Sequence, residues 1–115
     1  MTSAAEGDDG MDSEKLRRLK AEGWSVGSAA DFLELTPAEV VYIELRLQLA
    51  DCFRSLRRRN GLTQTQAAQR LGSSQSRVAK MEAADPSVSL DLMVKSLLTL
   101  GATPKDISSA IDQVA

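Results

Sequence analysis

Histidine is absent from this 115-residue sequence, and cysteine occurs only once, at Cys52. Without histidine, the sequence excludes His-based acid–base catalysis and His ligation of a metal. A single cysteine excludes an intramolecular disulfide and a multi-cysteine metal site. Cys52 lies in a stretch with the apolar pattern of a helix, so we expect it to be a small residue in the core or at its boundary. Neither a glycine-rich phosphate loop nor a cluster of catalytic groups is visible. We therefore expect a protein that is not an enzyme and that uses no cofactor or metal.

Aromatic residues are also scarce, since the chain has one Trp, one Tyr and two Phe. The core must then be built from Leu, Val, Ile, Ala and Met, which favours a small domain of the all-α class. No apolar run approaches the roughly 20 residues of a membrane-spanning helix, and no signal peptide is visible. We expect a soluble, cytoplasmic protein with no membrane partner, of a length that suits one domain with short appendages.

The net charge of −2 conceals an uneven distribution along the chain. Residues 1–37 carry a net charge of −4 and residues 85–115 a net charge of −2, whereas residues 38–84 carry +4. For attraction to phosphate, a local basic excess matters more than the total charge. The middle segment is therefore where we expect any contact with nucleic acid.

The centre of this basic segment carries the signals of two short helices separated by a glycine. Thr63 can cap the first helix, and Gln66, three residues later, can complete a capping box. Gly72 ends that helix, because glycine takes the left-handed conformation of a C-cap at little cost. Ser73 or Ser74 can start the second helix. The pattern predicts a helix–turn–helix over residues 63–84.

The second helix of this pair has one apolar and one polar side. Val78 and Met81 face the first helix, whose small Ala67 and Ala68 suit two helices that cross closely. The outward side carries side chains that form hydrogen bonds and are not acidic: Ser74, Gln75, Ser76, Arg77 and Lys80. Taken alone, such a face is compatible with a solvated surface as well as with the reading of bases.

Cap and stop signals divide the rest of the chain. Residues 1–12 are acidic and lack apolar periodicity, so we expect a disordered tail. Residues 13–37 are predicted to form a helical N-terminal extension, and residues 38–115 a five-helix domain. The first helix of that domain is predicted to begin at Thr36-Pro37 and to end at Asn60-Gly61.

The apolar positions of the flanking helices predict the core, because three- and four-residue steps place them on one face. In the long helix they are Val41, Leu45, Leu49, Cys52, Phe53 and Leu56. In the helix that Ser87 or Ser89 begins, they are Leu90, Val94, Leu97 and Leu98. The last helix, which Thr103-Pro104 begins, presents the apolar residues Ile107, Ala110, Ile111 and Val114, which are not assigned to the core. In the extension, Trp24 and Phe32 are expected to pack with Leu33 and Leu35.

Residues 57–101 resemble the XRE, or lambda-repressor-like, helix-turn-helix family. The residues that carry the resemblance are Leu62-Thr63-Gln64, Ala68, Gly72, Ser74-Gln75-Ser76, Val78, Met81-Glu82 and Ser89-Leu90-Asp91-Leu92. The wider stretch of residues 23–101 is similar to a subgroup that includes HigA-type antitoxins and related regulators. The resemblance implies a five-helix lambda-repressor-like DNA-binding domain with a helical N-terminal extension.

The resemblance also implies roles for individual residues. In this family the second helix of the pair lies in the major groove of double-stranded DNA, which assigns base reading to Ser74, Gln75, Ser76, Arg77 and Lys80. Phosphate contacts are assigned to Gln64, Arg58, Arg59 and Ser73. Arg57 and Glu82 occupy positions that form an internal ion pair in related domains. For Arg58 and Arg59, simple complementation of a helix dipole is the alternative.

We therefore expect a homodimeric, sequence-specific repressor, since one helix pair reads only a few base pairs. The predicted dimer surface is the last helix, through Ile107, Ile111 and Val114, with residues 24–35 as the alternative. Two roles remain open at this point: a stand-alone regulator, and an antitoxin that also binds a RelE-like toxin through the first 36 residues. A third alternative is a protein-interaction module that has kept the fold and lost DNA binding.

Overall fold

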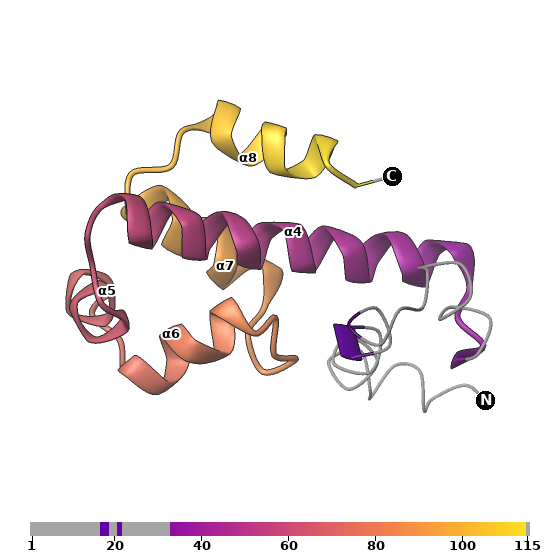
Figure 1. Cartoon of the computed structure of the whole chain (residues 1–115), viewed down its shortest axis with the longest axis horizontal. Coiled ribbons are helices and arrows are strands. Elements are labelled where there is room, and N and C mark those ends of the chain that lie inside the picture. Colours follow the sequence, from indigo (N-terminus) through magenta and orange to yellow (C-terminus); the bar gives the residue numbers. More distant parts are fainter. Residues whose placement is uncertain (1–16, 19–20, 22–32, 115) are drawn as a thin grey trace.

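The computed structural model describes residues 17–18, 21 and 33–114. Five helices follow one another between residues 37 and 112 (Figure 1). They are α4 (Pro37–Arg59), α5 (Gln64–Leu71), α6 (Gln75–Glu82), α7 (Leu90–Thr99) and α8 (Pro104–Asp112). The described residues contain no strand, so the predicted all-α class with five helices is confirmed. The predicted acidic tail and most of the extension, with Trp24 and Phe32, lie outside the described residues.

Local signals set the bounds of α4. The Thr36 side chain accepts a hydrogen bond from the Glu39 backbone N–H at 3.1 Å, and the Glu39 carboxylate accepts one from the Thr36 N–H at 2.8 Å. This capping box, with Pro37 in the first turn, begins the helix as predicted. The chain leaves α4 through Gly61, whose φ of 69° is a conformation that glycine adopts at little cost.

The long helix α4 is the axis on which the other helices are arranged. It contacts α6, α7 and α8. Figure 1 shows α8 along one side of α4, with α5 and α6 on the opposite side. Among the described residues, none of the helices combines the length and the apolar character needed to cross a bilayer.

The core lies where these helices meet. Its largest fully buried side chains are Phe53, Leu49, Met81, Met93, Leu97, Val78 and Val88. Two predictions of burial are wrong, since Val41 is 50% exposed and Leu98 is 46% exposed. The buried Ile43 lies two positions from Val41, and two positions along a helix turn it by roughly 200°. Leu98 lies one position beyond Leu97, a turn of about 100° away from the inner side that Met93 and Leu97 share, four residues apart and fully buried.

Candidate nucleic-acid interface

Helices α5 and α6 are a closely packed pair joined by a short turn. A capping box begins α5: Thr63 Oγ1 accepts from the Gln66 N–H at 3.1 Å, and Gln66 Oε1 accepts from the Thr63 N–H at 2.9 Å. Gly72 ends α5 in the left-handed conformation, with φ 63°. Of the two serines proposed as the next cap, Ser74 is the one used, because its hydroxyl accepts from the Arg77 N–H at 3.1 Å.

The sides of α5 and α6 that face each other are apolar, and the residues that α5 contributes are small. Ala67, Val78 and Met81 are fully buried, and Ala68 is 2% exposed. Small side chains on α5 let the backbone of α6 approach closely, which fixes the angle between the helices. The polar side of α6 must therefore point outward.

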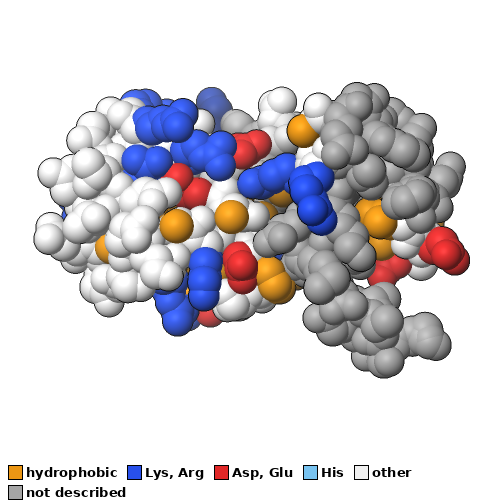
Figure 2. All heavy atoms as spheres, turned by 60° about the horizontal axis from the view of Figure 1, so that its bottom comes forward, with side chains coloured by type: hydrophobic (Ala, Val, Ile, Leu, Met, Phe, Trp, Pro, Cys, Tyr) orange, Lys and Arg blue, Asp and Glu red, His pale blue; other side chains and the backbone are white. Residues whose placement is uncertain are grey.

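All five side chains predicted to read bases are exposed at the start or on the outer side of α6: Ser74, Gln75, Ser76, Arg77 and Lys80. Figure 2 brings this side of the molecule forward and shows groups of Lys and Arg side chains on it. The Ser74 hydroxyl oxygen accepts the hydrogen bond that caps the helix, and its O–H can still donate a second hydrogen bond.

Arg57 and Glu82 form a bidentate ion pair between α4 and the last residue of α6. Arg57 donates from Nε to Glu82 Oε2 and from Nη2 to Glu82 Oε1 at 3.0 Å, and its Nη1 donates to the Leu62 carbonyl at 2.8 Å. The exposed fractions of the two side chains are only 12% and 5%. Burial alone would raise the pKa of Glu82, but hydrogen bonds from Arg57 and Gln64 and the charges of Arg57 and Arg54 hold that pKa below its ordinary value.

Gln64, the first residue of α5, connects this ion pair to the beginning of α6. Its Nε2 donates to Glu82 Oε1 at 3.3 Å, and its Oε1 accepts from Gln75 Nε2 at 2.7 Å. The Gln64 Nε2 group carries two N–H donors, and one of them makes this bond to Glu82. A single hydrogen-bonded chain thus runs from α4 through Glu82 and Gln64 to Gln75.

Two further arginines of α4 bind this region and were missed from the sequence. Arg54 donates from Nη2 to the Glu82 carbonyl at 3.0 Å, and Arg46 donates from Nη2 to the carbonyls of Asp85 and Val88. In the sequence, both arginines stand out only as part of the basic excess of residues 38–84. Their spacing from Arg57, at three and eleven residues along one helix face, is a signal that could have identified them.

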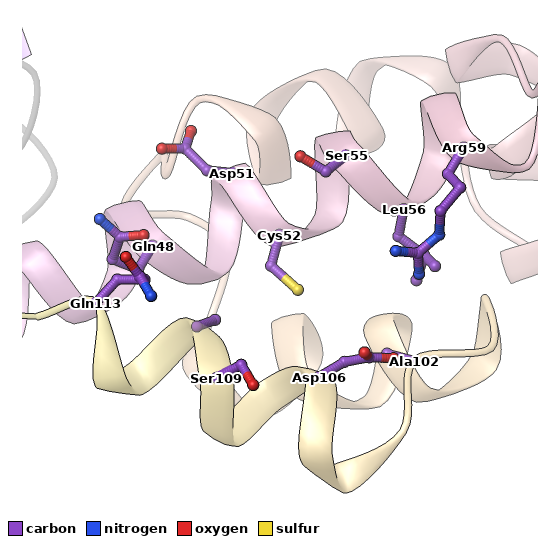
Figure 3. Close-up of a pocket in the computed structure, with 11 residues that line it drawn as sticks. Gln48, Asp51, Cys52, Ser55, Leu56, Arg59, Ala102, Asp106, Ser109 and Gln113 are labelled. Carbon is purple, nitrogen blue, oxygen red and sulfur yellow. The ribbon is translucent and has the colours of Figure 1, made fainter.

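The predicted phosphate residues do not all lie together. Arg58 is exposed near the end of α4, and Ser73 is half-buried in the turn between α5 and α6. Arg59 points instead into a groove between α4 and α8 (Figure 3), whereas α6 lies on the other side of α4 (Figure 1). The structure therefore separates Arg59 from the α6 face.

Cys52 also lines the groove between α4 and α8, and this groove has a volume of about 320 Å³. Burial raises the pKa of the Cys52 thiol, the charge of Asp106 raises it further, and Arg59 acts in the opposite direction. The half-buried position fits the predicted boundary residue. A raised pKa leaves little thiolate, so the thiol is a weak nucleophile near neutral pH.

The three residues predicted to form a dimer surface differ in exposure. Ile107 and Val114 are half-buried, and Ile107 packs against the core. Ile111 is 46% exposed. Of the three, Ile111 offers the most apolar surface to a partner.

Comparison with known proteins supplies an independent observation. Residues 48–109 match a family model described as a helix-turn-helix domain, which spans more than half of the chain. The matched range includes α5, α6 and α7, the second half of α4 and most of α8. No curated protein and no solved structure matches the chain.

Proposed function

Because the chain belongs to the helix-turn-helix domain family of DNA-binding regulators, we propose that it is a homodimeric repressor that reads a specific DNA sequence with α6. The observation that carries the proposal is the exposed side of α6. Its five outward side chains are hydrogen-bonding and non-acidic, and its first residue is held by Gln64. A helix face that only contacts solvent does not need a side-chain amide that is held in one orientation, as that of Gln75 is by Gln64.

The chemistry of these side chains suggests what they read. Gln75 uses one N–H for Gln64, which leaves its Oε1 and its second N–H for the N6 and N7 positions of an adenine. Arg77 can donate two hydrogen bonds to a guanine, and Ser76 can contact either base type. Gln64, Arg58 and Ser73 are the proposed phosphate contacts, while Arg59 is left out of this set because it faces α8.

The test is selection of bound sequences from random double-stranded DNA. We expect the wild-type protein to enrich one sequence, organised as two half-sites about one helical turn apart. The double variant Gln75→Ala, Arg77→Ala should lose that enrichment. Affinity for the enriched sequence should also fall steeply with salt, because phosphate contacts release counterions. Equal operator affinity of the double variant and the wild type would exclude α6 as the reading helix.

A narrower proposal is that the repressor is the antitoxin of a type II toxin–antitoxin pair. It is supported by the resemblance of residues 23–101 to HigA-type proteins and by the segment before α4, which the helix-turn-helix does not require. The test is co-purification with the product of a small, basic neighbouring gene, together with rescue of growth when that gene is expressed. Without such a partner, the stand-alone regulator remains. Loss of DNA binding altogether would leave the protein-interaction module.

A further inference from the structure

Arg46 is a buried arginine that binds the backbone beyond the end of α6. It is 3% exposed. Its Nη2 donates to the Asp85 carbonyl at 2.9 Å and to the Val88 carbonyl at 2.7 Å, across sequence separations of 39 and 42 residues. One guanidinium nitrogen therefore bridges two residues, three positions apart, within the turn that connects α6 to α7.

The surroundings hold this guanidinium in a single place. Nη1 of Arg46 donates to the Tyr42 hydroxyl at 3.4 Å, and the guanidinium carbon lies 5.8 Å from the centre of the Tyr42 ring. Tyr42 is one helical turn before Arg46 on α4, so the same helix supplies the arginine and the ring beside it. A lysine could not reproduce this arrangement, because its ammonium is a compact charge without the planar fork.

The turn that Arg46 bridges is strained. Ala84 has φ 55°, in the left-handed region that alanine rarely adopts, and its side chain is fully buried. Asp85 N–H donates to the Lys80 carbonyl at 3.0 Å, and the Asp85 carboxylate accepts from the Ser87 N–H at 2.9 Å. A strained residue persists only where its surroundings over-determine it. Arg46 is one of those determinants, because it binds the residue directly after Ala84.

The bonding of Arg46 is not optimised for stability. Among the described residues, its Nε is a buried side-chain nitrogen without a hydrogen-bond partner. Leaving a buried donor unpaired is costly, so this arginine does not use its full bonding capacity for stability. Its removal would in turn leave the carbonyls of Asp85 and Val88 without their donor, which also has a cost.

We propose that Arg46 is a positioning residue for DNA reading: by bridging the carbonyls of Asp85 and Val88 it fixes the carboxyl end of α6, and with it the tilt of the reading face. Arg54 assists through the carbonyl of Glu82, the last residue of α6. The amino end of α6 is held separately by Gln64. With both ends fixed, all outward side chains keep one orientation towards a base pair. The inference rests on the proposed function of α6.

The experiment compares Arg46→Met with Lys105→Met, which removes the same charge from an exposed position on α8. For each protein we would measure unfolding by urea, amide exchange at Val88, and affinity for the selected operator and for random DNA. For Arg46→Met we expect a lower stability than the wild type, because two carbonyls lose their donor. We also expect faster exchange at Val88, whose N–H donates to the Asp85 carbonyl that Arg46 holds. Operator affinity should be about tenfold weaker, comparable to one misread base pair, with affinity for random DNA as in the Lys105 variant.

The outcomes separate the two proposals. If the wild type selects no sequence, the proposed function of α6 fails, whereas the exchange measurement still tests the anchor. If Arg46→Met binds the operator as tightly as Lys105→Met, Arg46 has no positioning role. Should Arg46→Met not fold, Arg46→Lys is the second variant, since it keeps the charge and can reach one carbonyl. We expect it to fold and to lose part of the ratio of operator to random affinity; an unchanged ratio would overturn the proposal.

Discussion

Gln75, the first residue of α6, donates a 2.7 Å hydrogen bond from Nε2 to Oε1 of Gln64, the first residue of α5. The direction of this bond follows from Glu82. A carboxylate only accepts, so the amide nitrogen of Gln64 must face it. The Gln64 oxygen is then left for Gln75, which must present its nitrogen. The ion pair at the far end of α6 therefore determines which way the Gln75 amide is turned.

Gln64→Ala should weaken operator binding without unfolding the protein. The variant loses the bond that orients Gln75 and one proposed phosphate contact. At about 1 kcal/mol for each neutral hydrogen bond, we expect a Kd roughly 5- to 30-fold higher by fluorescence anisotropy. Gln69→Ala, at an exposed position of the same helix, is the matched control and should leave the Kd unchanged. Equal Kd values for the two variants would show that Gln64 does not orient the reading residue.

Glu82 should make stability depend on pH in the acidic range. Its pKa in the folded protein is lower than the ordinary value of 4.5. The stabilisation is therefore complete above the unfolded-state pKa and is lost as pH falls through the folded-state pKa. Urea unfolding between pH 7 and pH 3 measures the effect.

The matched variant for this measurement is Glu82→Gln, which cannot titrate. Removing one member of a buried pair leaves Arg57 without its partner, so we expect a loss of roughly 3 kcal/mol at pH 7. As the pH falls, the difference between the wild type and the variant should shrink. A constant difference down to pH 3 would mean that Glu82 is not the group responsible.

The local signals predicted where α4, α5 and α8 begin, and they left two candidate caps each for α6 and α7. Thr36-Pro37 and Thr103-Pro104 begin α4 and α8, Thr63 forms the predicted capping box with Gln66, and Gly72 ends α5. These features depend on contacts within four residues, which a sequence displays directly. The arrangement of α5 and α6 follows from them.

Burial and long-range polar contacts were harder to predict from the sequence. Val41 belongs to the apolar pattern of α4 and is nevertheless exposed, because burial depends on where α6, α7 and α8 pack. Arg46 interrupts an apolar stripe and is buried, since its partners are carbonyls about forty residues further along. Any residue has a carbonyl, so the spacing of Arg46 from Arg57 could indicate its helix face but side-chain identities could not indicate its partners. Arg59 is a similar case, since neighbouring positions of one helix face different partners.

Substitutions of Ser74 should distinguish its role in capping α6 from its proposed role in DNA reading. Ser74→Ala removes the acceptor for the Arg77 N–H and should lower the free energy of unfolding by about 1 kcal/mol. Ser74→Asp keeps a capping oxygen and should retain that stability, yet its charge would face the DNA phosphates. We therefore expect Ser74→Asp to be stable and to lose operator binding at least tenfold in an anisotropy titration.

The control for this charge is Thr103→Asp, which places the same carboxylate at the cap of α8. In Figure 1, α8 lies on the other side of α4 from α6. This variant should keep both its fold and its operator affinity. If the two aspartate variants bind DNA equally well, the amino end of α6 does not approach the phosphates.

Ile111→Glu should dissociate the proposed homodimer. Ile111 is 46% exposed on α8, and a charge in an apolar contact between two copies would have to be desolvated without a partner. Leu98→Glu is a control of equal exposure on α7. In sedimentation experiments at micromolar concentration, we expect the wild type and Leu98→Glu to be dimers and Ile111→Glu a monomer. The monomer should bind one half-site with the weak affinity of a single helix pair, because the second half-site no longer contributes. If Leu98→Glu alone were monomeric, the dimer interface would lie on α7. If the wild type stayed monomeric on its operator, the proposed homodimer would be excluded.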